Sequence, residues 1–119
     1  MQLKLIPTLA FLLAFLTPPS LATVALGTIT FETSDSSTTW NAAWIEGDDP
    51  CGSAVNINLN GENPCGIEFT LSNGYTYYLE NCGDGSFALY NSDGSYNHLC
   101  EYTGDDINGY CGIHREWDC

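Results

Sequence analysis

The chain has 119 residues, with 15 Asp and Glu against 2 Lys and Arg, which gives a formal net charge of −13. Proteins hold the phosphates of nucleic acids and anionic membranes with Lys and Arg, so this balance argues against both as partners. The length favours one domain over a multidomain enzyme.

Residues 1–22 have the features of a secretory signal peptide. Lys4 provides a positive start, a mostly apolar run follows from Leu5 to Leu16, and Ser20, Leu21 and Ala22 resemble a cleavage site. Cleavage after Ala25 is the alternative. The apolar run is too short to cross a bilayer, so we expect no membrane insertion. We predict a secreted, extracellular protein with a single disulfide-rich β domain over residues 23–119.

After residue 22 the sequence predicts short β-strands and no sustained helix. Runs of β-branched and alternating apolar residues recur, and turn signals that contain glycine separate them. In chain order the predicted strands are 24–33, 55–59, 66–72, 75–81, 86–91, 95–102 and 110–117. The segment 39–46 fits either a short helix or a strand. This spacing predicts an all-β fold, a small disulfide-stabilised antiparallel β-sandwich or barrel built from hairpins.

Two turn signals allow a prediction of strand register. A two-residue turn at Asn73-Gly74 pairs Ser72 with Tyr75 and, further out, Cys65 with Cys82 at a position where the backbones are close enough for a disulfide. That register predicts a core face and a mixed outer face. The predicted core face carries Ile67, Phe69, Leu71 and Tyr78, and the outer face carries Glu68, Thr70, Tyr75, Tyr77 and Leu79. A second hairpin, which turns at Asp93-Gly94, places Cys100 opposite Phe87.

The six cysteines predict three disulfides. All lie after the leader, none forms a C-x-x-C pair, and none lies at zinc-finger spacing from a histidine, so a metal site is not expected. After Cys65–Cys82 we expect Cys100–Cys111 and Cys51–Cys119. No cofactor is expected.

Acidic loops at 46–49 and 104–106 concentrate carboxylates. No bidentate glutamate follows at the spacing of a calcium loop, so the sequence favours solvated turn charges and leaves calcium binding open.

One set of residues has the chemistry of an acid–base catalyst. A small secreted hydrolase of the ribonuclease type needs side chains that transfer protons and a cation that binds the phosphate. The candidates for these roles are His98, His114 and Arg115, with Glu101 or Glu116. In a strand, however, His114 and Arg115 point to opposite faces, and the acidic chain repels a phosphate substrate. The sequence therefore favours a protein that is not an enzyme.

The sequence is also rich in aromatic residues. Aromatic rings beside Asn and Asp side chains suit the binding of a glycan or of a protein. The predicted binding residues are Tyr75, Tyr77, Tyr90, Trp40 and Trp44. Ordinary cross-strand aromatic packing is the alternative.

The leader that ends at Ala22, the short domain after it and the six spaced cysteines that end at Cys119 resemble the small secreted cysteine-rich proteins of fungi, many of which are effector-like. The resemblance implies an extracellular interaction protein. We therefore expect a monomeric, secreted, non-catalytic binding protein that recognises an extracellular or host protein or glycan. The alternatives are the ribonuclease-type hydrolase and a protease-resistant structural component.

Overall fold

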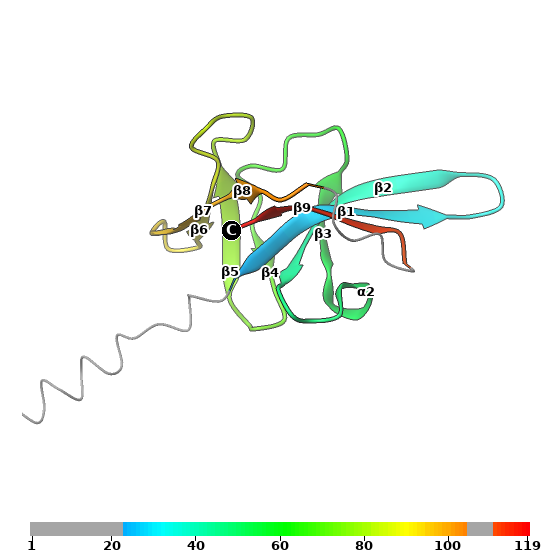
Figure 1. The fold of residues 1–119 in the computed structure, drawn as a ribbon, viewed down its shortest axis with the longest axis horizontal. Coiled ribbons are helices and arrows are strands. Elements are labelled where there is room, and N and C mark those ends of the chain that lie inside the picture. The colour runs from blue at the N-terminus through cyan, green and yellow to red at the C-terminus, as the bar shows by residue number, and fades with distance from the viewer. Residues whose placement is uncertain (1–22, 105–110) are drawn as a thin grey trace, which may run out of the picture.

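The computed structural model describes residues 23–104 and 111–119 (Figure 1). The predicted signal peptide lies outside the described residues. The same is true of residues 105–110, which include the acidic pair Asp105-Asp106 and the start of the last predicted strand.

The described chain forms two antiparallel sheets and one short helix (Figure 1). The elements are β1 (Val24–Glu32), β2 (Ser37–Ile45), α2 (Pro50–Ser53), β3 (Val55–Leu59), β4 (Phe69–Thr70), β5 (Thr76–Glu80), β6 (Ala88–Asn91), β7 (Tyr96–Leu99), β8 (Glu101–Tyr102) and β9 (Ile113–Asp118). The five-stranded sheet has the order β3-β2-β1-β9-β8, and the four-stranded sheet has the order β4-β5-β6-β7. The predicted all-β, sandwich-like fold is confirmed, without closure into a barrel.

Residues 39–45 of the segment that fits either a helix or a strand belong to β2. Strand β2 pairs with β1 in an unbroken register from Val24–Ile45 to Glu32–Ser37. In Figure 1 the outer half of this hairpin projects beyond the rest of the described chain. Helix α2 begins directly after the turn that follows β2. Asp49 caps it by accepting a hydrogen bond from the backbone N–H of Cys51 at 3.1 Å, and Pro50 suits the first helical turn.

Strand β1 is buried on both faces in its first half. Val24, Ala25 and Leu26 are all buried, although neighbouring side chains of a strand point to opposite sides. The main core lies between the two sheets and contains Val24, Leu26, Ala43, Phe69, Leu71, Tyr77, Leu79, Phe87, Leu89, Cys100 and Cys119. A second, smaller core contains Ala25, Ile29, Ala42, Trp44 and Ile113, with Cys51 and Ala54 packed against it. The five-stranded sheet therefore has apolar contacts on each side.

The register predicted for the first hairpin is wrong by one residue. Thr70 pairs with Thr76, and the N–H of Leu71 donates to the carbonyl of Tyr75 at 3.1 Å. The loop thus has three residues and ends at Gly74, whose φ of 86° belongs to the left-handed region that glycine favours. The slip exchanges the faces of β5, because side chains alternate along a strand. Tyr77 and Leu79 therefore join the core, and Tyr78 points outward.

The second hairpin confirms the predicted position of Cys100. The N–H of Cys100 donates to the carbonyl of Phe87 at 2.9 Å, and Leu89 pairs with His98. Nearer the turn, a β-bulge shifts the register, so that Tyr90 pairs with Tyr96.

Of the three predicted disulfides, Cys65–Cys82 is confirmed. The predicted position of this bridge within the paired strands is wrong. The crosslink lies beyond the end of β5, where Asn81 has a φ of 61° and turns the chain. Here Cys82 donates its N–H to the sulfur of Cys65 at 3.1 Å.

The predicted bridges Cys100–Cys111 and Cys51–Cys119 are wrong. The structure has Cys100–Cys119 and Cys51–Cys111. The reason lies at Cys100, where the chain passes from β7 in one sheet to β8 in the other. Because Glu101 pairs with Asp118, the adjacent residues Cys100 and Cys119 face each other, with 4.1 Å between their Cα atoms.

Candidate functional site

The five predicted binding residues do not form one surface. Tyr77 and Trp44 are 1% and 2% exposed, so these two predictions are corrected: both residues belong to the core. Trp40 is half-buried and packs against the smaller core. Tyr75 is exposed beside the loop of the first hairpin, and Tyr90 is half-buried on the four-stranded sheet.

Tyr90 is the centre of an aromatic row that crosses three strands. Tyr78 of β5 and Tyr96 of β7 flank it, since each is its direct partner in the sheet. The rings of Tyr78 and Tyr90 are stacked with centroids 5.6 Å apart, and the rings of Tyr90 and Tyr96 meet edge to face at 5.8 Å. We call Tyr78, Tyr90 and Tyr96 the tyrosine row. Its residues project from the side of the sheet opposite to the buried Leu79 and Leu89, so the row lies on the outer face.

The outer face that carries the row is partly exposed and nearly free of charge. We call it the tyrosine face. It consists of Thr70, Thr76, Tyr78, Glu80, Tyr90, Tyr96 and Leu99, with the buried Ala88 among them. Tyr96 is 56% exposed and Leu99 is 47% exposed. Glu80 is the one carboxylate in this set. Within the described chain the hydroxyls of the three row tyrosines have no hydrogen-bond partner, so they remain for water or a ligand.

Polar contacts in the hairpin loop hold Tyr96 in position. Asp93 accepts hydrogen bonds from the backbone and the hydroxyl of Ser95 at 2.9 and 2.6 Å, and these bonds, that of the hydroxyl first, lower the pKa of Asp93. Asn97, at the bulge, donates to the side-chain oxygen of Asn91 at 2.8 Å. The bulge and these bonds fix the register that brings Tyr96 beside Tyr90.

Tyr78 and Tyr96 are not among the predicted binding residues. The two-residue turn predicted at Asn73-Gly74 places Tyr78 on the core face, whereas the three-residue loop of the structure places it on the outer face. The run Tyr75-Thr76-Tyr77-Tyr78 indicates that one of its two adjacent tyrosines points outward, because neighbouring side chains of a strand alternate, but the hairpin register decides which one.

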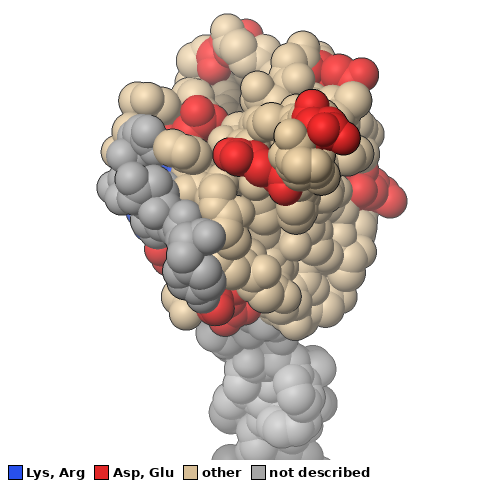
Figure 2. Space-filling view, turned by 90° about the vertical axis from the view of Figure 1, so that its right-hand side faces the viewer, with Lys and Arg blue, Asp and Glu red and all other residues tan. Residues whose placement is uncertain are grey.

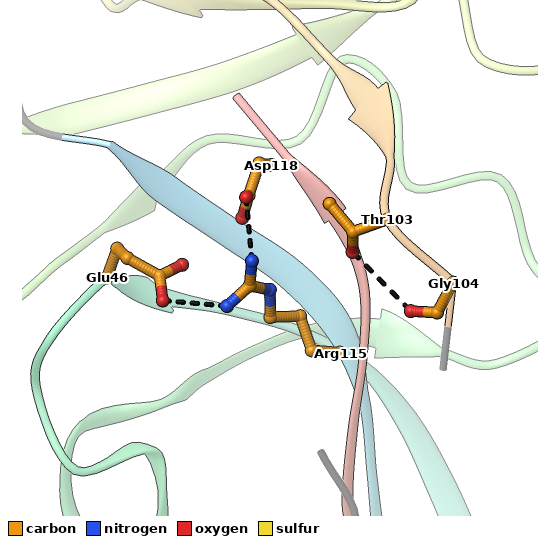
Figure 3. Close-up of polar contacts among 5 residues, drawn as sticks. All are labelled: Glu46, Thr103, Gly104, Arg115 and Asp118. Carbon is orange, nitrogen blue, oxygen red and sulfur yellow. Dashed lines mark hydrogen bonds and ion pairs between the residues drawn. The ribbon is translucent and has the colours of Figure 1, made fainter. Parts of the chain in front are cut away.

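The acid–base residues are divided between the two sheets. His98 is on β7, where its Nδ1 contacts the side-chain oxygen of Asn97, while His114 and Arg115 are on β9. Arg115 Nη1 donates to Glu46 Oε2 at 2.8 Å, and Nη2 donates to Asp118 Oδ2 at 2.7 Å (Figure 3). A phosphate would have to compete with two carboxylates for this guanidinium.

The contact between Arg115 and Asp118 depends on a bulge in β9. Three residues apart on a regular strand, the two side chains would point to opposite faces. The register shift between Leu26 and Gly27 of β1 places one extra residue of β9 between them, so that both point to the same side.

In the residues that the structure describes, no group of three His, Cys, Asp or Glu side chains is arranged to hold a metal ion. Over the same residues, no helix has the length and apolar character needed to cross a membrane.

The three disulfides and the tyrosine face are the main features of the described chain that bear on function. Comparisons with protein-family models, with curated protein sequences and with solved structures give no match to this chain.

Proposed function

We propose that the chain is a secreted, effector-like, non-catalytic binding protein that recognises an extracellular or host protein or glycan through its tyrosine face. The observation that carries the proposal is the tyrosine row, three neighbouring rings on the outer side of a sheet. Three disulfides support secretion, because structural disulfides are typical of proteins that fold in oxidising compartments.

The composition of the tyrosine face suits recognition. Tyrosine is enriched at the energetic centres of interfaces, because a rigid ring buries a large apolar area and its hydroxyl still forms hydrogen bonds. Tyr90 contacts both neighbouring rings and is held in place by them. Tyr96 and Leu99, on one edge strand, add exposed apolar surface beside it. Rings that are ordered before binding lose little side-chain entropy when a partner covers them.

The proposal is tested by removing two rings of the row. We would replace Tyr90 and Tyr96 with Ser and measure binding to arrays of extracellular proteins and of glycans. The matched control is Phe31→Ser, because Phe31 is 50% exposed and lies on the projecting hairpin of the other sheet. We expect the parent and the control to bind the same array member and the double variant to lose that binding.

Near-ultraviolet circular dichroism would verify that the double variant keeps its fold. If a folded double variant binds as well as the parent, the tyrosine face is not the contact surface and the proposal is wrong.

A further inference from the structure

We infer that the partner of the tyrosine face is a basic protein segment, whose Arg and Lys side chains lie against the tyrosine rings. This inference rests on the proposed binding function. It adds to it the chemical class of the partner and the reason for the acidic composition of the chain.

The charge of the described chain favours a basic partner. Arg115 is the only Lys or Arg among the described residues, and it is held by Glu46 and Asp118. Among the Lys, Arg, Asp and Glu side chains of the described residues, all the others are carboxylates. Figure 2 shows acidic side chains distributed around one face of the molecule. Such a field attracts a cationic partner over long distances and repels an anionic one.

The aromatic rings of the tyrosine face also favour a basic partner. The face of an aromatic ring carries partial negative charge and attracts Arg and Lys. No basic side chain of the described chain lies on the tyrosine face, so its rings are open to the cations of a partner.

Carboxylates also lie in the four-stranded sheet and its loops. Glu80 projects from the tyrosine face itself, and Asp84 and Asp93 lie in the loops that precede and follow β6. Hydrogen bonds from Ser86 and Ser95 hold the pKa of Asp84 and Asp93 below the ordinary value, so both carboxylates keep their charge in mildly acidic conditions. The rings together with Glu80 on the same face provide both contacts that a guanidinium uses, a flat surface and a hydrogen-bond acceptor.

A neutral glycan fits these observations less well. Its hydroxyls would use the rings and the unpartnered tyrosine hydroxyls, but they would gain nothing from the surrounding negative charge. A nucleic acid or an acidic polysaccharide would meet repulsion without a compensating cation.

The test uses an arginine-rich peptide as the probe and its glutamate-substituted counterpart as the negative control. We would measure the Kd of the disulfide-intact protein at low and at high salt. The key pair of variants is Glu80→Gln and Glu32→Gln. Each removes one negative charge, but Glu32 lies at the tip of the projecting hairpin, on the other sheet.

We expect the parent to bind the arginine-rich peptide more weakly as salt rises and not to bind its glutamate-substituted counterpart. The Tyr90→Ser, Tyr96→Ser double variant should bind about tenfold more weakly, as expected for two lost cation–π contacts. Glu80→Gln should weaken binding by about threefold, and Glu32→Gln should leave it close to that of the parent.

Two results would overturn the inference. Equal losses from Glu80→Gln and Glu32→Gln would mean that the peptide reads only the total charge of the molecule. Absence of peptide binding, together with tyrosine-dependent binding to a neutral glycan, would refute the basic partner and leave the proposed binding function intact. If the double tyrosine variant changes no binding of any kind, the proposed function itself fails.

Discussion

Removal of the Cys51–Cys111 disulfide should destabilise the protein more than removal of Cys65–Cys82. All four cysteines are half-buried, so replacing either pair with Ala removes a similar amount of packing. The two bridges differ in the length of the loop that they close, which is 60 residues for Cys51–Cys111 and 17 residues for Cys65–Cys82. A crosslink stabilises the folded state mainly by restricting the unfolded chain, and the restriction grows with loop length.

The loop lengths set the expected magnitudes. The chain-entropy relation gives about 4.3 kcal/mol for the 60-residue loop and about 3.1 kcal/mol for the 17-residue loop. The variant that lacks Cys51–Cys111 keeps only the 17-residue loop of this pair, and the variant that lacks Cys65–Cys82 keeps only the 60-residue loop. We therefore expect the two double variants to differ in free energy of unfolding by about 1.1 kcal/mol, which is 1.5RT times the logarithm of the ratio of the loop lengths.

Urea unfolding of the parent and of the two double variants under oxidising conditions measures these losses. Mass spectrometry of the unreduced proteins must first confirm that the two remaining bridges are Cys100–Cys119 and the other native pair. An equal or larger loss on removal of Cys65–Cys82 would refute the reasoning from loop length.

Three further outcomes are expected. Trypsin should leave the native protein intact at Arg115, which lies within β9 and is 16% exposed on its side chain, and should cut there after reduction, as mass spectrometry would show. The pKa values of Asp84 and Asp93 are lowered in the folded state, so their contribution to stability is present above the unfolded pKa and is lost as the pH falls through the folded values. The Asp84→Asn, Asp93→Asn variant should therefore lose less stability than the parent between about pH 5 and about pH 2 in thermal melts, and equal losses would contradict this. Gly27→Ala should destabilise by about 3 kcal/mol in urea unfolding, because its Cβ would lie 1.9 Å from a backbone oxygen of β9. Gly52→Ala is its control, with open space around the added methyl.

The first hairpin shows where local sequence signals stop being sufficient. An Asn-Gly pair suits a two-residue turn, and it equally suits the last two positions of a three-residue loop that ends in a left-handed glycine. The structure has the second arrangement, with Gly74 at a φ of 86°. The existence of both strands was predictable, but the slip of one residue moved Tyr77 into the core and Tyr78 out of it.

The candidate site was harder to predict because it depends on two registers at once. Tyr90 was identified, but its partners come from two other strands. The two-residue turn predicted at Asp93-Gly94 would place Asn97 opposite Tyr90. The structure has a three-residue loop that ends at Gly94, whose φ is 92°, and this loop puts Tyr96 there instead. The bulge then restores the predicted register at Leu89 and His98.

Two of the three predicted disulfides are wrong for a reason of topology. The pairing of Cys65 with Cys82 needed only local information, whereas Cys100 lies where the chain changes sheets. Its partner is set by the pairing of β8 with β9, two strands separated by residues 103–112. Alternating apolar residues reveal strands, but they do not reveal which sheet a strand joins.

Arg115, the one Lys or Arg among the described residues, has a structural role. Its guanidinium lies between Glu46 at the end of β2 and Asp118 on β9, two carboxylates that would repel each other without it. Removing one member of a partly buried ion group leaves an uncompensated charge, which is more destabilising than the loss of an exposed pair. The guanidinium of Arg115 is thus used for contacts within the fold. The other charged Lys, Arg, Asp and Glu side chains of the described surface are carboxylates, so no Lys or Arg of the described chain would compete with a cationic partner for the tyrosine rings.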